Sequence, residues 1–99
     1  MEIAPQTSHH VKCPEEGWEW KPSGKEETLY SEESRVLFCF STYYSDSPKQ
    51  FYSSVSVGDS WWYPQDNRSV PVTPEERETI KSRIRRALDL IGDTDAKVN

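Results

Sequence analysis

The segment Gly58-Asp-Ser-Trp-Trp-Tyr-Pro64 carries the strongest structural constraint in this 99-residue chain. Residues 58–60 have turn chemistry, and Pro64 ends the aromatic run, as expected of a short β-strand. Successive side chains of a strand point to opposite faces of its sheet, so Trp61 and Trp62 cannot both face inward. Each face of the predicted sheet therefore receives one indole.

The sequence after this strand predicts an α-helix over residues 74–91. Thr73 is a suitable N-cap, Pro74 fits the first helical position and Glu76 completes a capping box. Gly92 suits the left-handed residue that follows a helix. Apolar residues at helical spacing pack the helix on one face of the sheet: Ile80, Ile84, Leu88 and Ile91. The opposite face is either covered by the segment around Trp18 and Trp20 or left open.

The sequence before Gly58 predicts short antiparallel strands beginning near Trp18. Residues 28–30 and 35–42 flank a polar tetrapeptide, which is typical of a β-hairpin, and residues 51–57 alternate with period two. Residues 35–42 are apolar on both faces, and our core candidates are Phe38, Phe40 and Phe51. The expected fold is α+β: an antiparallel β-meander of three to five short strands with one C-terminal α-helix packed on one face.

We expect one domain, residues 17–92, because a chain of this length supports a single small core. Residues 1–16 show no apolar periodicity and predict a flexible N-terminal arm, while residues 93–99 predict a frayed C-terminal tail. No apolar run is long enough to cross a bilayer and residues 1–11 do not have the pattern of a signal peptide, so we expect a cytoplasmic protein without membrane contacts. Cys13 and Cys39 are then expected to be free thiols.

Charge is unevenly distributed along the chain. Seventeen acidic and twelve basic residues give a net charge of −5, and the excess lies in residues 1–34, where eight acids face three lysines. This balance favours a basic partner and disfavours nucleic acid and membrane surfaces, which attract positive charge. The five basic residues of the helix surround it. Arg77 falls in the apolar sector, which predicts a guanidinium that reaches a carboxylate near the sheet.

The sequence contains no arrangement of residues that dictates a reaction. Both histidines lie in the expected arm, away from any serine that they would activate, so we do not expect an enzyme. His9, His10 and Cys13 offer three donors suited to zinc, but a closed tetrahedral site needs a fourth. We therefore expect neither a metal site nor a cofactor.

Aromatic residues are abundant, at 12% of the chain with four tryptophans. Exposed tryptophan and tyrosine side chains are typical of binding hot spots. We predict an acidic and aromatic docking surface on the sheet face opposite the helix, to which one indole of Trp61 and Trp62 is committed. The candidate residues for this surface are Glu15, Glu16, Trp18, Glu19, Trp20, Tyr43, Tyr44, Trp61, Trp62 and Tyr63. In size, acidity and lack of catalytic groups the chain resembles the small bacterial immunity proteins. That resemblance in composition implies an antitoxin-like inhibitor that blocks a basic protein.

Two other functions fit the same residues. The aromatic face is suited to stacking on nucleic-acid bases or a small ligand, although only Arg35, Lys49 and Arg68 lie nearby to neutralise phosphates. Alternatively, the face forms the obligate interface of a homodimeric accessory subunit of an enzyme.

Overall fold

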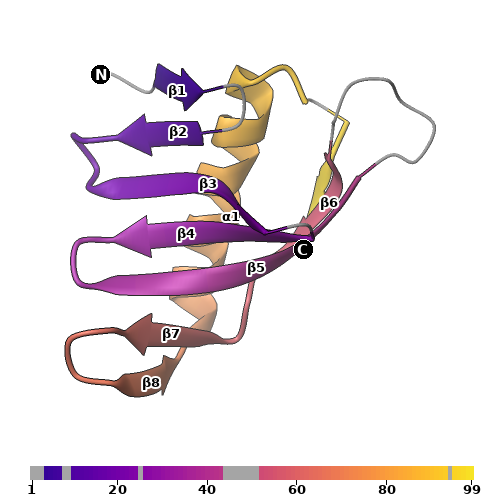
Figure 1. Cartoon of the computed structure of the whole chain (residues 1–99). Coiled ribbons are helices and arrows are strands. Elements are labelled where there is room, and N and C mark those ends of the chain that lie inside the picture. Colours follow the sequence, from indigo (N-terminus) through magenta and orange to yellow (C-terminus); the bar gives the residue numbers. More distant parts are fainter. Residues whose placement is uncertain (1–3, 8–9, 25, 44–51, 94) are drawn as a thin grey trace.

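The computed structural model describes residues 4–7, 10–24, 26–43, 52–93 and 95–99. Its first five strands form an antiparallel meander: β1 (Ala4–Thr7), β2 (His10–Cys13), β3 (Trp18–Gly24), β4 (Glu27–Glu32) and β5 (Arg35–Tyr43). The remaining elements are β6 (Tyr52–Ser56), β7 (Ser60–Tyr63), β8 (Arg68–Pro71), α1 (Pro74–Leu90) and β9 (Lys97–Val98). The sheet curls partly around α1, which crosses one of its faces (Figure 1).

The predicted α+β fold with one C-terminal helix on one face of a sheet is confirmed, but the predicted number of strands is wrong. The described residues form a nine-stranded sheet instead of three to five strands. One reason is that β5 is long enough to pair with two successive strands along the same edge. Phe40 of β5 lies opposite Ser56 of β6, and Val36 lies opposite Trp62 of β7.

Arg77 holds the joint between β6 and β7. Its guanidinium donates to the carbonyl oxygens of Val57 (3.0 Å) and Gly58 (3.1 Å), and to Oδ1 of Asp59 (2.7 Å). The predicted approach of Arg77 to a carboxylate is therefore confirmed. A Cβ atom at Gly58 would lie 2.3 Å from the carbonyl oxygen of Phe38, so the joint also requires a residue without a side chain.

The helix begins as its sequence predicts. The Thr73 side chain accepts from the Glu76 amide (3.1 Å), and the Glu76 carboxylate accepts from the Thr73 amide (2.9 Å). Ile80, Ile84, Ala87 and Leu88 are buried against the sheet. Gly92 follows the helix with φ +89°, a conformation that glycine adopts without steric cost. No helix in the described part of the chain has the length and apolarity needed to cross a membrane.

The sheet begins before Gly17, where we expected the arm to end. Strand β2 pairs with β3, and its residues Val11 and Cys13 are fully buried in the core. Gly17 supplies the positive φ of +75° in the turn between these two strands. A strand of four residues offers only two inward positions, too few for a convincing period-two pattern.

The C-terminal residues are docked on the sheet, unlike the frayed tail that we expected. Strand β9 pairs in parallel with β6, and the backbone of Asn99 bonds to Val55 and Val57 (2.9 and 2.8 Å). Arg85 donates to the carbonyl oxygens of Asp93 (2.9 Å) and Ala96. The pairing of the C-terminal residues with β6 joins positions more than 40 residues apart, so local sequence cannot predict it.

We predict that Gly58→Ala lowers the free energy of unfolding by about 2 kcal/mol or more, because the added methyl group collides with backbone rather than with a movable side chain. Urea denaturation measures the loss. The matched control is Ser60→Ala, an exposed position two residues further on, which changes stability by less than about 0.5 kcal/mol. Equal stability of the two variants would contradict the structure at this joint.

Cys13 and Cys39 are free thiols buried in the core, and burial raises the pKa of the Cys39 thiol to about 11. The thiolate is the reactive form, so inaccessibility and the raised pKa act in the same direction. We predict that neither thiol reacts with a chromogenic disulfide reagent in the native protein at neutral pH, and that both react in denaturant. Rapid native labelling of either residue would show that its strand opens readily.

Candidate functional site

Three of the four tryptophans lie on the inner face of the sheet, beneath α1. Trp18, Trp20 and Trp61 are at most 2% exposed and belong to the hydrophobic core. The Tyr30 ring lies among them, 6.1 Å from the Trp18 ring and 6.0 Å from the Trp61 ring between centroids. The prediction placed these three tryptophans on a docking surface. The structure instead uses them to fill the space between the sheet and the helix.

Trp62 lies on the opposite face, as strand alternation requires. We call this the outer face and define it by the outward apolar residues of β4, β5 and β7: Leu29, Val36, Phe38, Phe40 and Trp62. Leu29 lies opposite Phe38, and Val36 lies opposite Trp62. Trp18 and Trp20 point inward from β3 and do not cover this face. In the described parts of the chain, no element lies over it (Figure 1).

Phe38 and Phe40 are exposed to 48% and 56%, so their assignment to the core is wrong, and Phe51 lies outside the described residues. Leu37, Cys39 and Ser41 occupy the inward positions of β5. Both alternate sets of side chains in this strand are rich in apolar residues, so sequence alone did not identify the inward set. An antiparallel sheet face in contact with solvent normally carries polar side chains, and these two phenylalanines depart from that rule.

The charged residues of the outer face lie on β2, β3 and β4, beside the apolar residues. Lys12 is opposite Glu19, Lys21 is opposite Leu29, and Glu27 is opposite Phe40. Glu19 also bonds His10. Two lysines and two glutamates thus balance each other. At the end of this face that carries the turns 14–17 and 33–34, a groove of about 390 Å³ has Glu19, Glu33 and Val36 in its lining.

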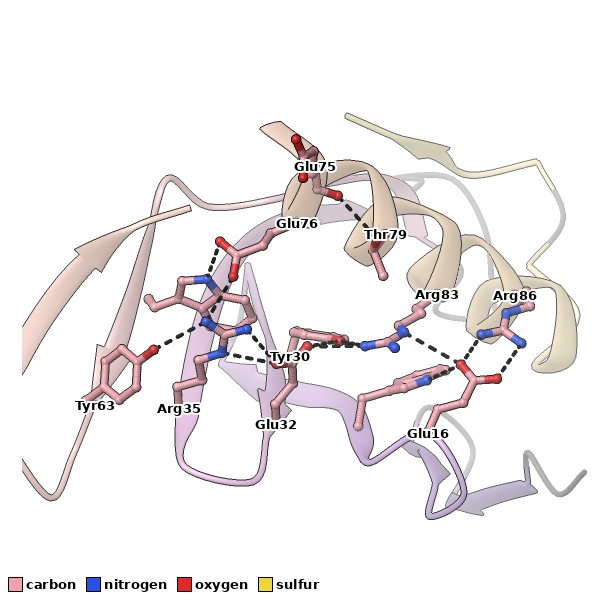
Figure 2. A network of polar contacts seen from close by, with 12 residues as sticks. Glu16, Tyr30, Glu32, Arg35, Tyr63, Glu75, Glu76, Thr79, Arg83 and Arg86 are labelled. Carbon is pink, nitrogen blue, oxygen red and sulfur yellow. Dashed lines mark hydrogen bonds and ion pairs between the residues drawn. The ribbon is translucent and has the colours of Figure 1, made fainter. Parts of the chain in front are cut away.

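A second group of polar residues lies where the helix meets the sheet, and we call it the polar seam (Figure 2). It comprises Glu16, Glu32, Glu76, Arg35, Arg83 and Arg86. Glu32 on β4 accepts two bonds from Arg35 (2.9 and 3.0 Å) and one from Arg83 of α1 (3.2 Å). Arg35 also reaches Glu76 at the start of the helix (3.0 Å).

The polar seam also bonds the polar atoms of buried aromatic residues. The Tyr30 hydroxyl donates to Glu32 (2.7 Å) and accepts from Arg83 (2.7 Å), and its pKa is raised because the phenol is buried. Trp61 Nε1 donates to Glu76 (3.2 Å), while the Arg35 guanidinium lies 3.7 Å from the Trp61 ring centroid. The seam therefore fixes the aromatic core as well as the helix.

Glu16 belongs to the polar seam rather than to a free acidic surface. Its carboxylate accepts from Arg86 (2.6 and 3.2 Å) and from Trp18 Nε1 (3.1 Å). The bonds from Arg86 and Trp18, with the charges of Arg86 and Arg83, lower the pKa of Glu16 to about 2. Arg83 and Arg86 stand three residues apart at the border of the apolar helix face, a spacing that hinted at contacts with the sheet.

The other predicted site residues are separated from one another. Glu15 is exposed in the turn after β2, and Glu19 lies on the outer face. Tyr63 is half-buried on the inner side, where its hydroxyl accepts from Arg35 (3.3 Å). The backbone of Tyr43 pairs with Tyr52, and Tyr44 lies outside the described residues. Of the predicted aromatic residues with described side chains, only Trp62 joins the outer face.

The histidine and cysteine residues of the expected arm do not converge on one point. His10 bonds Glu19 on the outer face, whereas Cys13 is buried on the inner face of the same strand. His9 lies outside the described residues. Within the described ranges, no three His, Cys, Asp or Glu side chains cluster as metal ligands. Beside the seam lies a cleft of about 270 Å³. Its lining includes Trp61, Thr79 and Arg35 with its two carboxylate partners, Glu32 and Glu76.

Comparisons with protein-family models, with curated proteins and with solved structures gave no match. The function of this protein therefore has to follow from the chemistry of the outer face and of the polar seam.

The ion pair of Glu16 predicts a pH-dependent contribution to stability. A carboxyl pKa lowered from 4.5 to about 2 stabilises the folded state above the ordinary pKa, and this stabilisation disappears as the pH falls toward 2. We predict that Glu16→Gln lowers the urea midpoint at neutral pH and that the difference from the native protein shrinks steadily below pH 4.5. The same substitution at exposed Glu78 is the control, with little effect. A difference for Glu16→Gln that does not change with pH would contradict this assignment.

Proposed function

We propose that this protein is a non-catalytic protein-binding module, an antitoxin-like inhibitor that blocks a basic protein through the outer face of its sheet. The observation that carries the proposal is the exposure of Phe38 and Phe40, 48% and 56%, at the centre of a face that no described element covers. Large apolar side chains gathered on one exposed face are typical of a protein-binding surface.

The sheet edges are less suited to a partner than its face. The edge strands of the described sheet are β1, β8 and β9. Strands β1 and β8 contain four residues each, including a proline, and β9 contains two residues. Short strands and prolines are features by which proteins prevent the addition of a further strand. A partner strand at Pro5 or Pro71 would meet a backbone nitrogen without a hydrogen to donate. These features favour docking through side chains of the outer face.

The distribution of charge supports a basic partner. All six arginines of the described chain form an ion pair with a carboxylate, so their positive charge is locally compensated. At one end of the sheet, the groove that opens near Val36 has three glutamates and one lysine in its lining, and the glutamate of the turn, Glu33, is exposed. With a net charge of −5, this acidic end attracts a basic protein toward the outer face and speeds their encounter.

The same pairing weighs against binding of nucleic acid. Arg35 contacts Glu32 and Glu76 and lies over Trp61, and Arg68 contacts Asp66 and lies over Tyr63. Neither guanidinium lies on the outer face, where bases stacked on Phe38 or Phe40 would require neutralised phosphates. The two lysines of that face, Lys12 and Lys21, are balanced there by Glu19 and Glu27. Lys49, the third cation of that alternative, lies outside the described residues.

Photo-crosslinking in the native host tests the proposal. A benzophenone amino acid replaces Phe38 in one variant and Leu90 in the other, because Leu90 is an apolar side chain exposed to 42% on the helix instead of the sheet. We expect a covalent adduct with a basic protein from position 38 and none from position 90. Mass spectrometry identifies the protein in the adduct.

Two results would overturn the proposed function. One is an equal yield of the same adduct from positions 38 and 90, which would remove the outer face as the docking site. The other is that the variant with the crosslinker at position 38, during growth in the host, forms no adduct with any protein other than a second copy of this chain.

A further inference from the structure

We propose that, in the absence of its target, the outer face is occupied by the outer face of a second copy of this chain. The protein is then a face-to-face dimer, and the basic partner must displace one subunit in order to bind. This inference rests on the proposed function in one respect, namely that the outer face is a protein-binding surface. It adds the identity of a competing occupant and a means of regulation.

Charge complementarity favours a second copy. Lys12 and Lys21 balance Glu19 and Glu27 on the outer face, so the net charge of −5 arises from residues elsewhere in the chain. Two copies of an acidic protein repel each other through most pairs of surfaces. On the outer face this repulsion is weak, because its two lysines and two glutamates cancel and each copy offers both signs to the other.

The size of the face suits a weak dimer. Strands β2 to β5 and β7 lie side by side and contain 30 residues in all, and at a spacing of about 4.8 Å and a rise of about 3.3 Å per residue they present roughly 480 Å² in outline. A stable interface buries about 800 Å² on each partner, and smaller interfaces are typical of weak association. One outer face therefore fits a second copy that binds weakly enough for a basic partner to displace it.

The residues on the face fit the symmetry of such a dimer. In a two-fold dimer each residue patch meets the same patch of the other copy. The apolar side chains lie on the adjacent strands β4, β5 and β7. The charged residues of β2 and β3 lie toward one side, and Glu27 of β4 lies opposite Phe40. Two sheets packed face to face at about 10 Å bury interdigitated apolar side chains. Phe38 and Phe40 are placed to fill that layer.

Sedimentation velocity of the purified full chain tests the inference. Between about 1 µM and 1 mM, the range of weak to moderate affinity, we expect a reversible shift from monomer to dimer. The double variant Phe38→Thr/Phe40→Thr keeps side chains that favour strands and is expected to weaken the dimer by about tenfold or more. The control Leu90→Ala, which also removes an exposed apolar side chain, leaves the dimer unchanged.

A native protein that stays monomeric throughout this range would overturn the inference, as would a dimer that the double variant does not weaken. Thermal unfolding of the double variant at low concentration, unchanged from the native protein, shows that the variant folds. If it does not fold, the single variant Phe38→Tyr replaces it. This variant adds a hydroxyl group at the interface and is also expected to weaken the dimer. If the native protein is monomeric but still crosslinks to a basic target from position 38, the dimer proposal is wrong and the proposed function stands. If the protein dimerises but forms no such adduct, the inhibitory function is wrong and the dimer proposal stands.

Discussion

The structure depends on one geometric constraint, the alternation of side chains along a β-strand. Because neighbouring residues of β7 point to opposite faces, Trp61 is buried beneath α1 and Trp62 lies on the other side of the sheet. One helix can cover only one face. The same alternation in β5 places Leu37 and Cys39 inside, and Phe38 and Phe40 outside. The asymmetry between a covered face and an open face, on which the proposed function rests, follows from this constraint.

The two faces obtain their stability and their chemistry in different ways. On the inner face, large aromatic side chains bring polar atoms into the core, and the polar seam bonds those of Trp18, Tyr30 and Trp61. Glu16 bonds the indole of Trp18, Glu76 bonds that of Trp61, and Glu32 bonds the phenol of Tyr30. Arginines then balance these carboxylates. Much of the acidic and basic composition of this chain is therefore used for structure, which leaves fewer charges for a partner than a count of residues suggests.

The accuracy of the sequence-based predictions differed between local and tertiary features. The helix was predicted well because Thr73, Pro74 and Gly92 act on their immediate neighbours. The opposite orientations of Trp61 and Trp62 followed from geometry alone. In contrast, the strand status of residues 10–13 and 97–98 depends on pairing with distant strands, and a short strand carries too little pattern to be found. The sequence did not show which alternate side chains of β5 point to the inner face, because Phe38 and Cys39 are both plausible core residues.

An open sheet face opposite the helix was among the predicted arrangements, but the residues that form it were not predicted. A docking face opposite the helix was expected, yet Trp18 and Trp20 were assigned to it and Phe38 and Phe40 were not. The reason is that exposure was inferred from residue type, whereas strand register decides it. Glu16 was assigned to an acidic surface, although Arg86, seventy residues away in sequence, pairs with it. Such long-range pairs depend on how the helix lies across the sheet.

The central claim is that the phenylalanines of β5 stand in solvent while the neighbouring tryptophans do not. A paramagnetic relaxation agent that is soluble in water, applied in NMR to dilute protein, measures this directly for each aromatic ring. The account predicts strong broadening of the Phe38 and Phe40 ring signals and none for Trp20 or Trp61. Protection of both phenylalanine rings to the same degree as Trp61 would contradict it.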